Sequence, residues 1–119
     1  MIAGTGSGCG KTMVTLTVLR AMQRRNIPLA AFKCGPDYID PMFHKAVLGI
    51  PSRNLDLFFI SEREVRGQIV RSIPQNGIGV IEGVMGFYDG VSGTTDTASA
   101  AHLARETGTP AILVVRPKG

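Results

Sequence analysis

The segment from Gly4 to Thr12, GTGSGCGKT, has the residue types and spacing of a phosphate-binding loop. The backbone N–H groups of such a glycine-rich loop form a nest for an anion, and a helix that follows adds the positive end of its dipole. Lys11 is placed to reach the β- and γ-phosphates of a nucleoside triphosphate, and the Thr12 hydroxyl to hold magnesium. We therefore expect ATP and Mg²⁺ to bind at this loop, through Gly6, Ser7, Gly8, Cys9, Gly10, Lys11 and Thr12.

The loop is a variant of the strict pattern G-x-x-x-x-G-K-[ST]. That pattern needs glycine at position 5, where this sequence has Thr5, and Gly4 lies one residue too early. The glycines at 6, 8 and 10 still give the backbone the freedom that a phosphate nest requires. An ordinary glycine-rich turn is the alternative interpretation, and the lysine and threonine that follow argue against it.

A carboxylate ends the run Ile78–Glu82, whose other residues are apolar or glycine and which is typical of a buried strand. Glu82 stands at the carboxyl end of that strand, where ligands bind in open α/β sheets. It can reach a metal ion directly or through water. The alternative is a solvated glutamate at the end of a strand.

More charged residues occur in KCGPDYIDP, residues 33 to 41. Lys33 ends a strand, and Asp37 and Asp40 lie in the loop that follows it. Carboxylates beside a triphosphate favour magnesium ligation, although the segment alone could also be a solvated acidic turn. Asp89, in the loop 86–90, could move over the same site or only stabilise its own turn.

Strands alternate with helices along the chain, which predicts an α/β fold. We expect strands over 1–3, 29–34, 78–82 and 111–115, and helices over 11–25, 41–48, 61–73 and about 95–106; residues 49–59 are irregular. The strands are nearly continuous apolar runs, typical of a parallel sheet covered by helices on both faces, as in P-loop nucleotide-binding proteins. Because the chain starts within one strand and ends just past another, buried strand, we expect the domain to be truncated at both ends.

Length and composition fit one globular domain over residues 1–119. The chain has a net charge of +4 and two cysteines, and its arginines are scattered. Scattered basic residues argue against a nucleic-acid partner, and a phosphate ligand explains part of the surplus. With so few cysteines and no apolar run of the ~20 residues needed to cross a bilayer, we expect a cytoplasmic protein without a membrane partner.

Four motifs together resemble one family. The motifs GTGSGCGKTMVTL, KCGPDYIDPMFH, PSRNLD from Pro51 to Asp56 and VIEGVMGFYDG from Val80 to Gly90 are similar to the N-terminal synthetase domain of cobyrinic acid a,c-diamide synthases. The resemblance spans nearly the whole chain. Dethiobiotin synthetase and cobyric acid synthase are wider relatives. The more distant partition and septum-site ATPases carry an extra lysine where this loop has Gly6.

This resemblance implies an ATP-dependent carbon–nitrogen ligase that amidates acetate side chains of a corrin ring, with ammonia drawn from glutamine. ATP would activate a carboxylate as an acyl phosphate, and ammonia would displace the phosphate. The family's site carries over residue by residue: Lys11 and Thr12 to phosphate and magnesium, Lys33 to charge near the transferring phosphate, Asp37, Asp40 and Glu82 to metal binding and catalysis, Asp89 to catalysis, and Tyr38 to substrate recognition.

Several properties of the protein have more than one interpretation from the sequence alone. The family enzyme has a glutaminase domain with a nucleophilic cysteine, and neither Cys9 nor Cys34 fits that role, so we expect a separate glutaminase domain or another ammonia source. A homodimer is possible. The substrate could be cobyrinic acid, hydrogenobyrinic acid or a nickel sirohydrochlorin. A nucleotide switch of the partition type is the alternative function, and His44 is either a ligand beside the acidic loop or structural.

Overall fold

The computed structural model of the chain describes residues 1–35 and 40–118, and the side chains of all of these except residues 40–43. Its strands are β1 (Ile2–Gly4), β2 (Leu29–Cys34), β3 (Ser52–Leu55), β4 (Ile78–Glu82) and β5 (Ile112–Val114). Its helices are α1 (Lys11–Arg24), α2 (Asp40–Leu48), α3 (Glu62–Ser72) and α4 (Ala100–Thr107). The described strands form one parallel sheet in the order β3-β2-β4-β1-β5.

Helices cover both faces of this sheet, as the apolar strands predict. Side chains of a strand alternate between its two faces, so each strand supplies two cores. Phe32 and Ile81 pack with Val65 of α3 and Leu103 of α4 on one face. Leu29, Ala31 and Val80 pack with Leu19 of α1 on the other face, where α2 also contacts β2 and β3. The expected α/β fold is therefore confirmed.

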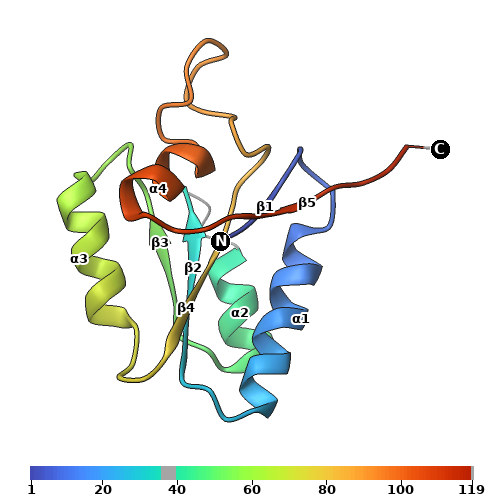
Figure 1. Cartoon of the computed structure of the whole chain (residues 1–119), viewed down its shortest axis with the longest axis vertical. Helices are drawn as coiled ribbons and strands as arrows, with labels where there is room; N and C mark the ends of the chain where they lie inside the picture. Colours follow the sequence, from blue (N-terminus) through green and yellow to red (C-terminus); the bar gives the residue numbers. More distant parts are fainter. Residues whose placement is uncertain (36–39, 119) are drawn as a thin grey trace.

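Figure 1 shows how the chain is arranged around the carboxyl ends of β2 and β4. The phosphate loop between β1 and α1 and the long segment between β4 and α4 lie at this same end of the molecule. Parallel strands place all their carboxyl ends at one edge, which is why residues far apart in the sequence meet there. This edge holds the candidate site.

Three expectations about elements need correction. Residues 49–59, expected to be irregular, contain β3, whose sequence SRNL has a single apolar side chain and so gives no strand pattern. The helix expected from about residue 95 begins only at Ala100, because Ala98 has a φ of 61° and Ser99 caps the helix by accepting from the His102 N–H. The third concerns β5, expected to be buried: Ile112 and Leu113 are exposed.

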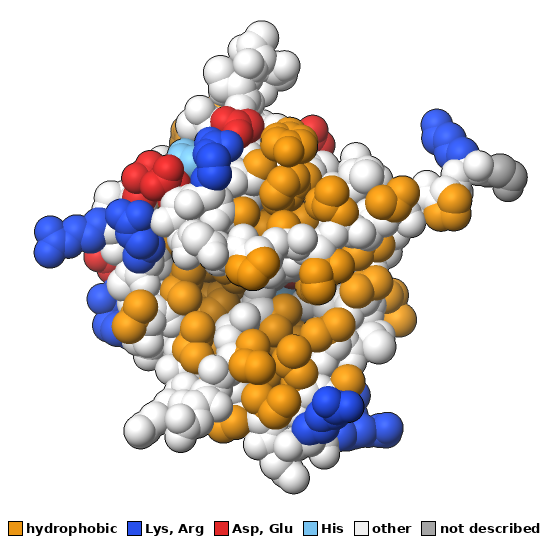
Figure 2. Space-filling view, viewed as in Figure 1, with side chains coloured by type: hydrophobic (Ala, Val, Ile, Leu, Met, Phe, Trp, Pro, Cys, Tyr) orange, Lys and Arg blue, Asp and Glu red, His pale blue; other side chains and the backbone are white. Residues whose placement is uncertain are grey.

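The exposed residues of β5 belong to a wider apolar surface. Figure 2 shows hydrophobic side chains gathered over the face across which β5 runs in Figure 1. Val115, just after β5, is also exposed. Among the residues that the structure describes, no helix is both long enough and apolar enough to cross a membrane.

Candidate active site

The loop between β1 and α1 has the backbone of an anion nest. Gly8 and Gly10 have φ values of 69° and 104°, a left-handed conformation that side chains other than glycine rarely adopt. Gly4, which lies too early for the strict pattern, has a different role: a Cβ there would collide with the Cys9 Sγ and crowd the Lys11 side chain. No acidic residue stands in the first turn of α1, so the positive end of its dipole is not neutralised from within.

Lys11 lies over this loop. Its Nζ donates to the Gly6 carbonyl at 2.7 Å, and the side chain is buried. Beside it is a cleft of about 440 Å³, lined by Ser7, Gly8, Gly10, Lys11, Thr12, Met13, Lys33, Val84 and Met85. The glycine-rich loop, the start of α1 and two lysines thus line one space, an arrangement suited to binding a polyphosphate.

The pairing of β2 with β4 sets Lys33 opposite Glu82. Lys33 follows Ala31 by two residues and Glu82 follows Val80 by two, so both side chains lie on the face covered by α1 and α2. At this end of the sheet a buried ion pair therefore replaces the apolar core. The distance from Lys33 Nζ to Glu82 Oε1 is 3.1 Å, and both side chains are almost completely buried.

Glu82 is the centre of a larger polar cluster. Thr12, in the first turn of α1, donates its hydroxyl to Glu82 Oε1 at 2.6 Å. His44, in α2, places Nε2 2.8 Å from Glu82 Oε2 and Nδ1 3.0 Å from the Ser52 hydroxyl of β3. Two helices and three strands thus contribute to the surroundings of one carboxylate.

These contacts determine the charge of Glu82. Burial raises its pKa, but hydrogen bonds from His44 and Thr12 and the charge of Lys33 outweigh that effect and bring the pKa from 4.5 to about 2. Glu82 is therefore ionised at neutral pH. Because an ionised carboxylate only accepts hydrogen bonds, His44 Nε2 must carry a proton.

The donor set fits magnesium. The Thr12 hydroxyl and the Glu82 carboxylate are hard oxygen ligands that lie within hydrogen-bond distance of each other. Both lie beside the loop that would hold the phosphates. Mg²⁺ usually binds through one or two carboxylates together with substrate phosphates, so this arrangement can hold it.

Comparison with known proteins agrees with this geometry. The family model described as "CobQ/CobB/MinD/ParA nucleotide binding domain" matches residues 1–100. The chain belongs to this family. The family is the one expected from the four motifs, and the prediction of a nucleotide-binding domain is confirmed.

Three relatives to which the chain is similar are all named cobyrinate a,c-diamide synthase. The chain is 46% identical to the cobyrinate a,c-diamide synthase of Salmonella typhimurium over 118 residues, which are 99% of the chain and 26% of that protein. The corresponding enzyme of Thermoplasma acidophilum is 43% identical over 115 residues (97% and 26%), and that of Synechococcus 47% over 115 residues (97% and 25%). The chain spans about a quarter of the length of these curated relatives.

Only some of the site residues predicted from the sequence lie together in the structure. Lys11, Thr12, Lys33 and Glu82 lie in one contiguous site. Asp37 and Tyr38 lie outside the described residues, and so does the side chain of Asp40, although its backbone begins α2. Their assigned roles stay predictions.

Asp89 lies apart from the Glu82 cluster in its described contacts. Its Oδ2 accepts from the Gly86 N–H at 2.8 Å, and its own N–H donates to the Gly86 carbonyl at 3.0 Å. These bonds close a turn, which agrees with one of the two interpretations of this residue. Its proposed part in catalysis stays a prediction.

The sequence left open whether His44 is a ligand beside the acidic loop or a structural residue. It is fully buried and contacts the central carboxylate of the site. One signal in the sequence was its spacing of four residues from Asp40, which places both on one face of a helix that follows the acidic loop. A lone histidine on a short helix is more often structural, and that expectation concealed the contact.

Cys34 is not arranged as an activated nucleophile. Burial, and after it the nearby Asp56 carboxylate, raise the pKa of Cys34 to about 12 against the opposing effect of Lys33. The Cys34 thiol therefore stays protonated and inert. Cys9 lies within the phosphate loop, where its Sγ is 3.9 Å from Lys11 Nζ.

Proposed function

We propose that this chain is the ATP-binding part of a ligase that amidates acetate carboxylates of a corrinoid, with cobyrinate as the substrate. The observation that carries the proposal is the buried carboxylate of Glu82, held by Thr12, Lys33 and His44 beside a phosphate loop. The names of the relatives support the choice of substrate.

The reaction has two balanced steps. An oxygen of the substrate carboxylate attacks the γ-phosphorus of ATP, the bond to the β-phosphate oxygen breaks, and ADP leaves. Ammonia then attacks the carbonyl carbon of the acyl phosphate, the C–O bond to phosphate breaks, and the amide loses a proton. Ammonia would come from glutamine, hydrolysed by a glutaminase domain, or from free ammonia.

The residues of the chain would bind and orient these groups. The loop amides and Lys11 would hold the β- and γ-phosphates, and Lys33 would offset negative charge as the phosphoryl group transfers. Thr12 and Glu82 would hold Mg²⁺, which supplies charge stabilisation on the phosphate oxygens when bound. Asp37, Asp40 and Asp89 would assist at the same edge, and Tyr38 would contact the corrinoid.

The test uses the native protein, supplied with ATP, Mg²⁺ and ammonia. We expect ATP-dependent amidation of cobyrinate, measured by mass spectrometry, with hydrogenobyrinate and nickel sirohydrochlorin as alternative substrates in parallel reactions. Lys11→Ala should weaken ATP binding by about 2–4 kcal/mol in calorimetry, because it removes a buried charge partner of the phosphates. Lys45→Ala is the matched control, since this lysine is exposed on α2.

Two results would contradict the proposal. Unchanged ATP affinity in Lys11→Ala would exclude the loop as the phosphate site. ATP hydrolysis without amidation of any of the three tetrapyrroles, accompanied by ATP-dependent dimers in gel filtration, would favour a nucleotide switch of the partition type.

A further inference from the structure

A second, mostly apolar pocket adjoins the phosphate cleft. Its volume is about 710 Å³, within the range of small-molecule sites. It is lined by Gly35, Asp56, Phe58, Phe59, Val84, Met85, Asp89, Gly90, Val91 and Ala98. Val84 and Met85 also line the phosphate cleft, so the two spaces share a wall at the place where a phosphate acceptor must approach.

Large apolar side chains are exposed around this pocket. Phe58 and Phe59 are 61% and 70% exposed, and their rings pack edge to face with centroids 4.9 Å apart. Met85 and Val91 are also exposed. Exposed apolar groups that gather at a concave surface mark a binding site rather than a core.

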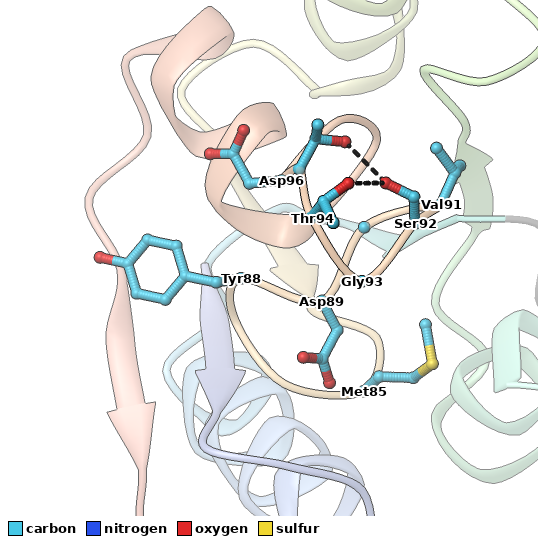
Figure 3. A pocket seen from close by; sticks show the side chains of 10 residues that line it. Met85, Tyr88, Asp89, Val91, Ser92, Gly93, Thr94 and Asp96 are labelled. Carbon is cyan, nitrogen blue, oxygen red and sulfur yellow. Dashed lines mark hydrogen bonds between the residues drawn. The ribbon is translucent and has the colours of Figure 1, made fainter.

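The loop after β4 supplies part of the wall of this pocket and also lines a neighbouring pocket, which is drawn in Figure 3. The two pockets share Met85, Asp89 and Val91, and in Figure 3 Tyr88 is directed away from Met85 and Asp89. The bond between Asp89 and the Gly86 N–H stabilises the turn that lies between Met85 and Val91. The apolar wall is therefore held in place before a ligand arrives.

Asp56 gives the pocket a polar point in addition to Asp89. The residue is only 9% exposed, and its Oδ1 accepts from the Phe58 N–H at 2.9 Å. Its Oδ2 is buried and has no hydrogen-bond partner among the described residues. A buried carboxylate oxygen without a donor is costly, so this atom indicates a ligand that brings an N–H or O–H group.

We propose that this pocket binds the acceptor substrate, a large and mostly apolar ring system that carries carboxylate side chains. The ring would lie against Phe58 and Phe59, and one acetate would extend past Val84 and Met85 into the phosphate cleft. Asp56 Oδ2 would accept a hydrogen bond from the substrate, for which the carboxamide left by a first amidation supplies an N–H. This inference rests on the proposed function and assigns the side of the site that faces the acceptor.

The test is a Phe58→Ala/Phe59→Ala double variant of the protein as the cell makes it. We expect the dissociation constant for cobyrinate, measured by equilibrium dialysis, and the KM for cobyrinate to rise by about tenfold or more, because the aromatic contact area is lost. The KM for ATP should change by less than about twofold, since no phosphate contact is altered. Val70→Ala, a 77% exposed side chain on α3, is the control.

A second variant tests the polar point. Asp56→Asn keeps the acceptor for the Phe58 N–H but can place an N–H₂ group where Oδ2 now stands, so we expect weaker binding of cobyrinate monoamide, whose carboxamide supplies the N–H, with unchanged ATP binding. If the double variant binds cobyrinate, and Asp56→Asn binds the monoamide, as the Val70→Ala control does, while the wild-type protein amidates cobyrinate, the pocket assignment is wrong and the proposed function stands. If the wild-type protein neither binds nor amidates cobyrinate, the proposed function itself fails.

Discussion

Two histidine–glutamate pairs in this molecule show how surroundings decide what the same residue types can do. His44 and Glu82 are fully buried, 2.8 Å apart, at the carboxyl edge of the sheet. His102 and Glu62 lie 3.4 Å apart on the surface formed by α4 and α3, with exposed fractions of 18% and 46%. Glu106 lies near the second pair, and the three ligand atoms are within 4.8 Å of one another.

The buried pair is constrained from every side, and the surface pair is not. Glu82 accepts from Thr12 and Lys33 as well as from His44, whereas the described contact of Glu62 is the single long one to His102. Charge interactions are strong where water is excluded and weak where it is not. Function and stability should therefore depend on the first pair far more than on the second.

The largest expected effect comes from removing the charge of Glu82. Glu82→Gln keeps the shape of the side chain, but Lys33 then lacks its carboxylate partner. We expect turnover in the proposed amidation of cobyrinate to fall about a hundredfold or more, the effect of losing one preorganised electrostatic contact. ATP should still bind, because the loop amides and Lys11 are unchanged. Glu62→Gln is the matched control, and equal turnover in the two variants would contradict a special role for the buried carboxylate.

The same substitution should alter how stability depends on pH. The pKa of Glu82 is about 2 in the folded chain against an ordinary value of 4.5, so its contribution is present above about pH 4.5 and is lost as pH falls toward 2. The shift corresponds to ~3 kcal/mol. Urea unfolding at pH 6, 4 and 3 should show the difference between wild type and Glu82→Gln shrinking with pH. A constant difference would mean that the carboxylate is not held as described.

Much of the fold could be predicted because its signals are local. The apolar runs of β2 and β4 and the capping box at Ser61 and Glu64 specify their elements from adjacent residues, and the Ser61 hydroxyl does accept from the Glu64 N–H. By contrast, β3 exists because β2 offers it hydrogen-bond partners, in a register from Ala31 opposite Ser52 onward. A pairing between strands leaves no pattern in four residues of mixed polarity.

The candidate site divides in the same way. Lys33 and Glu82 could be placed from the sequence, because parallel strands bring their ends to one edge. The contact of His44 with Glu82 could not, because it depends on how α2 packs against β2 and β3. Asp56 ends the motif PSRNLD, but the motif did not indicate its unpaired oxygen, which follows from a turn in which the other oxygen accepts from the Phe58 N–H.

An intermediate effect is expected at His44. His44→Ala removes both ring contacts and leaves a cavity, so we expect a loss of about 2–4 kcal/mol in unfolding free energy and about a tenfold lower kcat with a smaller change in the KM for ATP. His44→Gln can still donate to Glu82 from its amide nitrogen. It should recover part of the kcat. If Gln restores stability but leaves kcat as low as in the Ala variant, the ring does not act by positioning Glu82.

The smallest effect is expected at the surface pair, which together with Glu106 forms the one group of three His, Cys, Asp or Glu side chains among the described residues whose ligand atoms are spaced to hold a metal ion. His102 Nδ1 accepts from the Ala98 N–H at 2.9 Å, so in the neutral ring Nε2 carries the proton and has no lone pair for a metal. We therefore expect that Zn²⁺ added at micromolar concentration does not raise the melting temperature through this group. His102→Ala should cost about 1 kcal/mol or less, chiefly through the bond to Ala98, and should leave amidation unchanged. Stabilisation by Zn²⁺ that disappears in His102→Ala would show that the ring exchanges its hydrogen bond to Ala98 for a metal ion. The two histidine–glutamate pairs would then differ in what they bind rather than in how deeply they are buried.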